Sequence, residues 1–213
     1  MWNAYLRCDL DADRRCRITL SSEQRKRCLG SAMVRPRLDK GLVHLITGDG
    51  PGKTTSALGL GMRAAGQGYR VYMIQFMKGT WNHEVYGEVK FLRSVRRFQV
   101  RQFGRGEFVE KRKPDKVDRD QAARGLKHAQ KLIQRGRHDI VILDEILVAL
   151  GYNLLSRRDV SALMKDRPRH VELILTGRDA PRQLHRLADY VIEIKEIKHP
   201  FRRGVLARKG VEY

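Results

Sequence analysis

The sequence has few cysteines and no long apolar run, and these absences exclude several classes of protein. Its three cysteines, Cys8, Cys16 and Cys28, all precede residue 30. The odd count, without the two-residue spacing of a metal knuckle, argues against a disulfide scaffold and a zinc site. No run approaches the ~20 apolar residues of a transmembrane helix, and the charged N-terminus lacks the apolar core of a secretory signal. We therefore expect a cytoplasmic protein.

Acidic residues are scarce relative to basic ones. The chain has 213 residues with 44 Lys and Arg against 24 Asp and Glu, which gives a net charge of +20. Such an excess is compatible with a solvated basic surface, with nucleic acid, or with anionic ligands and acidic partners. The basic residues are spread along the chain without a zinc-finger spacing, an RNA-recognition signature or a helix-turn-helix pattern. We therefore do not expect nucleic acid to be the partner.

Composition divides the chain into two parts. Residues 1–38 are rich in Arg and have no sustained apolar period, although Ser21-Ser22-Glu23-Gln24 can cap one short helix. We expect this basic segment to be poorly ordered, and Met33 near its end is a candidate start codon. Residues 39–213 are long enough to form one domain with a sizeable core.

The most informative stretch runs from Leu42 to Thr55. An apolar run leads into a glycine-rich turn, and a helical pattern follows from Ser56 to Ala65. This order of strand, loop and helix is typical of a phosphate-binding P-loop. Glycines let backbone N–H groups surround a phosphate, and the helix N-terminus adds free N–H groups and a positive dipole end. The turn reads Thr47-Gly48-Asp49-Gly50-Pro51-Gly52-Lys53-Thr54-Thr55.

Two side chains of this turn have a predicted role toward a nucleotide. Lys53 is expected to reach the terminal phosphates, and the Thr54 hydroxyl is expected to bind Mg²⁺. The loop is one residue shorter than the usual pattern, because Gly48 leaves three residues before Gly52. Asp49 adds a carboxylate that is unfavourable beside phosphate unless it meets another group. The alternative is a glycine-rich turn that resembles a nucleotide site by chance.

A second stretch, from Asp139 to Glu145, predicts a metal site. Its near-continuous apolar run is typical of a buried parallel strand, and it ends in Asp144 and Glu145. In P-loop proteins we expect such a strand beside the P-loop strand, with its acids reaching the magnesium ion. These acids can also simply cap the next helix, but their combination with Gly-Lys-Thr upstream favours the metal site.

The remaining pattern alternates strands and helices. We therefore predict an α/β fold of the P-loop, RecA-like type, with a mostly parallel sheet and helices on both faces. Arg178 follows a strand on the expected ligand side of the sheet, where it suits a phosphate or carboxylate or is only a surface charge. The further strands are expected at Arg70–Phe76, Val89–Leu92, Phe98–Phe103, Val171–Thr176 and Tyr190–Ile194. The further helices are expected at Pro114–Arg135, with Val117 on its apolar face, at Arg158–Lys165 and at Gln183–Leu187.

Several short stretches of the sequence are weak signals individually but form a specific combination. They are Thr47–Leu60, Gln75-Phe76-Met77-Lys78-Gly79, Leu143-Asp144-Glu145, Leu175-Thr176-Gly177-Arg178, and the tail from Lys198-His199-Pro200-Phe201 to Gly210-Val211-Glu212-Tyr213. Together they resemble the ATP:corrinoid adenosyltransferases of the cobalamin pathway, a family in which the P-loop is also shortened. The resemblance covers Gly41 to Tyr213. It implies that Co(I) of a corrinoid attacks the 5′ carbon of ATP, takes the 5′-deoxyadenosyl group and releases triphosphate.

The resemblance also implies which residues form the site. ATP would lie in the P-loop in the reverse of the usual sense, so that its 5′ carbon is exposed. Asp49 falls where the family usually has asparagine, near the ribose hydroxyls. Thr54 and Glu145 would hold Mg²⁺ or Mn²⁺, with Asp144 supporting them, and Lys53, Thr54 and Glu145 would be catalytic. The implied ATP-binding residues are Gly48, Asp49, Gly50, Pro51, Gly52, Lys53, Thr54, Thr55 and Arg178.

Two departures from the family concern the ligands. Pro51 stands where lysine is usual, so a phosphate contact is expected to be missing. The loop from Gly104 to Val109, which we expect to be flexible, matches a loop whose two aromatics press on the lower corrin face. Phe108 is its one aromatic residue here, and we predict that it binds the corrinoid.

The family further implies a homodimer and a flavodoxin-like protein as reductant. Two hypotheses from other classes remain at this point. One is a RecA-like ATPase acting on nucleic acid, which the positive charge favours. The other is a nucleotide-dependent regulator without catalytic activity.

Overall fold

The structure, a computed structural model, describes residues 8–10, 16–18, 36–80, 85–107, 109–111 and 113–212. The chain forms two compact units, Met1–Arg35 and Pro36–Tyr213. In the first unit, strands β1 (Cys8–Leu10) and β2 (Cys16–Ile18) pair in antiparallel fashion. The expected cap at residues 21–24 and the candidate start at Met33 lie outside the described residues.

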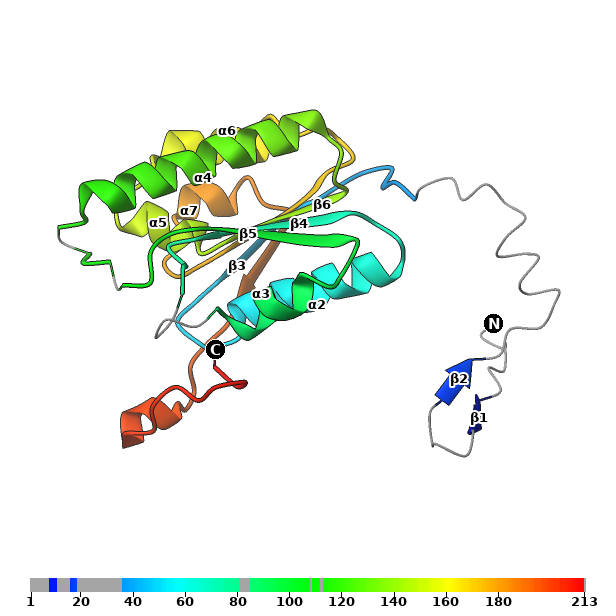
Figure 1. Cartoon of the computed structure of the whole chain (residues 1–213). Helices are drawn as coiled ribbons and strands as arrows, with labels where there is room; N and C mark the ends of the chain where they lie inside the picture. The colour runs from blue at the N-terminus through cyan, green and yellow to red at the C-terminus, as the bar shows by residue number, and fades with distance from the viewer. Residues whose placement is uncertain are drawn as a thin grey trace. The chain divides into compact units, whose positions relative to one another are not determined.

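A six-stranded sheet forms the centre of the second unit (Figure 1). Its strand order is β5-β4-β6-β7-β3-β8, and every neighbouring pair is parallel. The strands are β3 (Val43–Thr47), β4 (Val71–Phe76), β5 (Phe98–Phe103), β6 (Ile140–Asp144), β7 (Glu172–Thr176) and β8 (Tyr190–Glu193). The predicted α/β fold with a parallel sheet is therefore confirmed.

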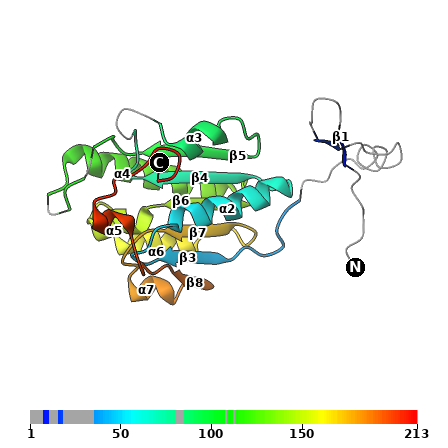
Figure 2. The same cartoon turned by 90° about the horizontal axis from the view of Figure 1, so that it is seen from below.

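Helices cover both faces of this sheet, as the sequence predicts (Figures 1 and 2). One face carries α2 (Lys53–Gly66) and α3 (Gly87–Leu92). The other carries α4 (Lys116–Arg135), α5 (Ile146–Gly151), α6 (Arg157–Lys165) and α7 (Arg182–His185). A 3₁₀ helix, η1 (Pro200–Arg203), follows β8. Within the described parts of the chain, no helix has the length and apolar character that crossing a membrane requires.

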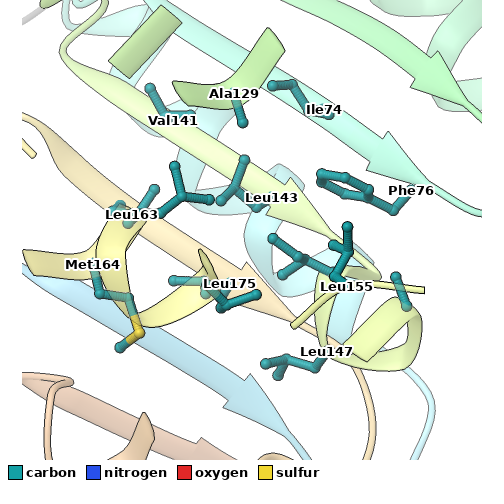
Figure 3. Close-up of a cluster of buried hydrophobic side chains, with 14 of the residues drawn as sticks. Ile74, Phe76, Ala129, Val141, Leu143, Leu147, Leu155, Leu163, Met164 and Leu175 are labelled. Atoms are coloured by element: carbon teal, nitrogen blue, oxygen red, sulfur yellow. The ribbon is translucent and has the colours of Figure 1, made fainter. Parts of the chain in front are cut away.

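Strand β6 contributes to the core on both faces of the sheet. Val141 and Leu143 pack in the cluster under α4, α5 and α6, which Figure 3 shows together with Leu163 and Leu175. Ile142 packs in the cluster under α2 instead. Successive side chains of a strand point to opposite faces, so an uninterrupted apolar run serves a strand that is covered on both sides. This burial places the end of β6 deep in the sheet.

The prediction of a strand at Val89–Leu92 is wrong, because these residues end helix α3. Val89 and Leu92 are buried whereas Phe91 is 56% exposed. Buried positions three residues apart fit a helix turn, whereas a strand would bury alternate residues. Four residues are too few to distinguish the two periods in the sequence.

Two further expectations also need correction. Strand β6 does not lie beside β3, because β7 pairs with both of them. Val117 is 51% exposed, so it does not belong to the apolar face of α4. In addition, the sequence patterns did not predict α5, the short helix that follows Glu145 directly.

We predict that the basic N-terminal segment does not contribute to the stability of the second unit. A protein that begins at Met33 should unfold in denaturant with nearly the same free energy as the full chain, because residues 1–32 lack core patterning. A loss of more than about 1–2 kcal/mol would instead show that the segment packs on the core. Lost activity with unchanged stability would assign the segment to the closure of the site.

Candidate active site

A cavity of about 920 Å³ lies at the carboxyl ends of the parallel strands. In open α/β sheets this edge is the usual place for a ligand. The P-loop forms one wall, and residues that follow β4, β6, β7 and β8 complete it. The lining residues are Gly50–Thr55, Leu58, Lys78, Tyr86, Gly87, Glu88, Glu145, Arg178, Lys198, His199, Pro200, Arg208, Gly210, Val211 and Glu212.

The P-loop backbone is shaped by two glycines with positive φ. Gly48 has φ of 102°, and a Cβ there would lie 2.2 Å from the carbonyl oxygen of Ile194. Gly52 has φ of 105° and is the N-cap of α2, where no side chain caps the helix. The first N–H groups of α2 therefore remain available at the wall of the cavity. Such a helix start favours an anion such as phosphate.

Lys53 is a largely buried cation at the start of this helix. It is 7% exposed, and its Nζ donates to the carbonyl oxygen of Gly50 at 2.6 Å. Burial lowers the pKa of Lys53, and the nearby positive charge of Arg178 lowers it further. An ammonium group has three donors, so an anion in the cavity would both complete its hydrogen bonds and stabilise its charge.

The fully buried carboxylate of Asp144 connects four elements around the P-loop. Its Oδ1 accepts hydrogen bonds from the hydroxyls of Thr54 at 2.9 Å and Thr176 at 2.7 Å. Its Oδ2 accepts from Lys78 Nζ at 2.8 Å and Gln75 Nε2 at 3.2 Å. Four donors use the capacity of two carboxylate oxygens. Asp144 is therefore arranged to orient Thr54 and Lys78.

Glu145 follows directly and is held in a strained conformation. Its φ is 60°, in the left-handed region, which costs a non-glycine residue roughly 1–3 kcal/mol. Its N–H donates to Thr176 Oγ1 at 3.0 Å, and the residue lines the cavity. Burial raises the pKa of Glu145, and the negative charge of Asp144 adds to this effect. A cation in the cavity would therefore favour the ionised form.

Thr54 and Glu145 are the residues that can hold a metal ion here. The Thr54 hydroxyl donates its hydrogen to Asp144 and accepts a hydrogen bond from Lys78 Nζ at 3.2 Å, so one lone pair of its oxygen remains for a metal ion. Among the described residues, no group of three or more His, Cys, Asp or Glu side chains can form a metal site. Magnesium usually needs fewer protein ligands, because phosphate oxygens and water complete its shell. The donor set thus fits Mg²⁺ that arrives with a nucleotide.

The structure brings most of the predicted site residues together. Gly50, Pro51, Gly52, Lys53, Thr54, Thr55, Glu145 and Arg178 line one cavity, and Asp144 lies behind Thr54.

Gly48 and Asp49 are not among the lining residues. Asp49 is exposed, and its Oδ1 accepts from the N–H of Glu196 at 3.2 Å, a hydrogen bond that lowers the pKa of Asp49. Its contact with the ribose remains a prediction.

Phe108, the predicted corrinoid-binding residue, lies outside the described residues. The loop around it contains Gly104 and Gly106, which we expected to make it flexible. Both glycines allow close backbone approach, because a Cβ would lie 2.6 Å from Lys78 N at Gly104 and 2.8 Å from Thr80 O at Gly106.

Lys78 is a site residue that the sequence alone did not predict, although it lies in the stretch Gln75-Phe76-Met77-Lys78-Gly79. Lys78 follows β4, bonds to Asp144, and lies 5.6 Å from the centre of the Tyr86 ring. Burial opposes its protonation, but the carboxylates of Asp144 and Glu145 outweigh burial and raise the pKa of Lys78. The signal that could have identified Lys78 was its position directly after a buried strand of a P-loop protein. No comparable signal in the sequence indicated that the C-terminal tail lines the cavity.

The family model described as ATP:corrinoid adenosyltransferase BtuR/CobO/CobP matches residues 39–213. A corrinoid adenosyltransferase of Escherichia coli (strain K12) is 35% identical over 177 residues, which are 82% of this chain and 87% of the relative. Corrinoid adenosyltransferase CobA of Salmonella typhimurium is 34% identical over 176 residues, with the same coverage. A corrinoid adenosyltransferase of Pseudomonas aeruginosa is 31% identical over 192 residues, which are 90% of this chain and 93% of the relative. The chain therefore belongs to the ATP:corrinoid adenosyltransferase family.

Proposed function

We propose that the protein transfers the 5′-deoxyadenosyl group of ATP to Co(I) of a corrinoid and releases triphosphate, in adenosylcobalamin biosynthesis. The observation that carries this proposal is the family match over residues 39–213, a range that contains the whole P-loop cavity. The cavity also has the charge that the leaving group requires, because Lys53 and Arg178 line it together with the start of α2.

The proposed reaction is a displacement at the 5′ carbon of ATP. The electron pair of Co(I) forms the cobalt–carbon bond, and the bond between the 5′ carbon and its oxygen breaks. Triphosphate leaves with the electron pair of the broken carbon–oxygen bond, so negative charge grows on the group that the P-loop holds. Lys53, Arg178 and the N–H groups of α2 would stabilise this charge more in the transition state than in bound ATP. ATP would lie with its 5′ carbon turned away from the P-loop.

We propose that Thr54 and Glu145 hold Mg²⁺ or Mn²⁺ on the polyphosphate. When bound, the metal ion would neutralise part of the triphosphate charge. Asp144 would hold the Thr54 hydroxyl in place through their 2.9 Å hydrogen bond. Because its two oxygens already accept four hydrogen bonds, Asp144 would act through Thr54 and Lys78 rather than on the metal directly.

Other parts of the proposal rest on the resemblance to the family. We infer that Phe108 covers the lower corrin face, that a flavodoxin-like protein supplies the electron for Co(I), and that the enzyme is a cytoplasmic homodimer. The alternative, a RecA-like ATPase acting on nucleic acid, has no support from the matched family.

The phosphate product distinguishes the two functions. The protein should be incubated with ATP, Mg²⁺ and a chemically reduced corrinoid while the cobalt–carbon spectrum is followed. Adenosyl transfer produces one triphosphate for each cobalt–carbon bond. Orthophosphate without a spectral change would show hydrolysis and contradict the proposal.

Removing charge from the site should reduce turnover strongly. We predict that Lys53→Ala and Glu145→Gln each lower the rate by ~10²–10³, because the first removes a cation that stabilises the developing anion and the second removes a ligand of the metal ion that does so. Lys131→Ala on the exposed side of α4 and Glu193→Gln on β8 are matched controls and should keep the wild-type rate. Near wild-type turnover of either site variant under saturating ATP and Mg²⁺ would contradict the assignment.

Phe108→Ala should affect the formation of Co(I) more than its reaction. Co(I) forms most readily when the lower axial position of cobalt is empty, and an apolar side chain excludes water and bases from that face. We therefore predict a larger rate loss with Co(II) corrinoid and a protein reductant than with preformed Co(I). Phe91→Ala, at a phenylalanine that is 56% exposed, is the control. Equal losses with both cobalt states, or a large fall in melting temperature, would assign Phe108 to packing.

A further inference from the structure

The chain after β8 returns to the P-loop and is attached to it through the backbone. We call residues 194–212 the C-terminal strap (Figure 1). Ile194 N donates to Thr47 O at 2.8 Å, and Gly50 N donates to Ile194 O at 2.9 Å. The absence of a side chain at Gly48 makes this approach possible, since a Cβ there would lie 2.2 Å from Ile194 O. The start of the strap is therefore part of the P-loop structure.

The far part of the strap forms a wall of the same cavity. Arg208 and Glu212 both line it, and they form an ion pair with each other. Arg208 Nη2 donates to Glu212 Oε1 at 2.9 Å, and the N–H of Arg208 donates to Glu212 Oε2 at 2.7 Å. The guanidinium holds the pKa of Glu212 below its usual value, so Glu212 is ionised at neutral pH. A paired cation thus faces the space between the P-loop and the strap.

Beyond Ile194, which packs against the core, the large apolar side chains of the strap are exposed. Ile197 is 97% exposed, Phe201 is 67% exposed and Leu206 is 74% exposed. The side chains of Arg208 and Glu212 are 57% and 32% exposed, and an ion pair so close to solvent contributes little to stability. The strap therefore combines a firm attachment at Ile194 with a weak interaction near its end, and that interaction can be exchanged without disturbing the core.

Phosphate can replace the carboxylate of Glu212 on Arg208. A guanidinium presents five donors in a planar fork that suits carboxylate and phosphate oxygens alike. We propose that Arg208 binds the polyphosphate of ATP, and then the triphosphate product, in exchange for Glu212. Glu212 thereby competes with the product and favours its release. This inference rests on the proposed function, because it takes the P-loop cavity as the triphosphate site.

The test is calorimetric titration of Mg²⁺-triphosphate and MgATP into full-length variants. Arg208→Gln should weaken triphosphate binding by about 10-fold or more, as expected for a lost charge-assisted hydrogen bond. Glu212→Gln should strengthen it several-fold and make triphosphate a stronger product inhibitor. In the double variant, Glu212→Gln should have no further effect, because it acts through Arg208. Arg203→Gln is the control, since Arg203 is an exposed strap residue outside the lining set.

The possible results separate this inference from the proposed function. A wild-type protein that binds neither MgATP nor Mg²⁺-triphosphate would contradict the proposed function itself. Wild-type binding that Arg208→Gln leaves unchanged, like Arg203→Gln, would overturn only the role of Arg208. Weaker binding in Glu212→Gln would overturn the competition and show that Glu212 holds the strap in its binding position. Melting temperatures of all variants should match the wild type, because the strap lies outside the core.

Discussion

The buried carboxylate of Asp144 is the interaction on which the candidate site depends. It joins the end of β6 to α2 through Thr54, to the end of β4 through Gln75 and Lys78, and to β7 through Thr176. A carboxylate without exposure is tolerated only when it is fully hydrogen-bonded and paired with a cation. Breaking such a buried pair from one side typically costs about 3–5 kcal/mol. The same network therefore stabilises the fold and orients the P-loop threonine.

Other features of the site follow from this arrangement. Thr176 accepts from the N–H of Glu145 while it donates to Asp144, so one hydroxyl positions both neighbouring acids. Asp144 is saturated by its donors, whereas Glu145 lines the cavity with a raised pKa and gains from a cation. Two adjacent carboxylates thus receive different roles from their surroundings. The proposed adenosyl transfer uses this difference between the two carboxylates. Glu145 would hold the metal ion that the leaving triphosphate needs, whereas Asp144 holds Thr54 and the cation of Lys78 in place.

Much of this site could be predicted from the sequence, because its elements are local. The P-loop, the apolar run before Asp144 and the long helix α4 each depend on a pattern of neighbouring residues. The order of the strands could not be predicted, because pairing β7 between β3 and β6 is a long-range choice. Helix α3 was mistaken for a strand because four residues fit both periods. The strap was missed because backbone hydrogen bonds attach Ile194 to the P-loop, and the glycine at position 48 that permits them is also expected in any P-loop.

A crystal structure of the protein with MgATP would test the central claim most directly. The account predicts the triphosphate along Gly50 to Thr55, the metal ion on Thr54 and Glu145, and the 5′ carbon turned away from the P-loop. Asp144 should keep its hydrogen bonds to Thr54, Thr176 and Lys78. A direct bond between the metal ion and Asp144, or a nucleotide bound outside this cavity, would contradict the account.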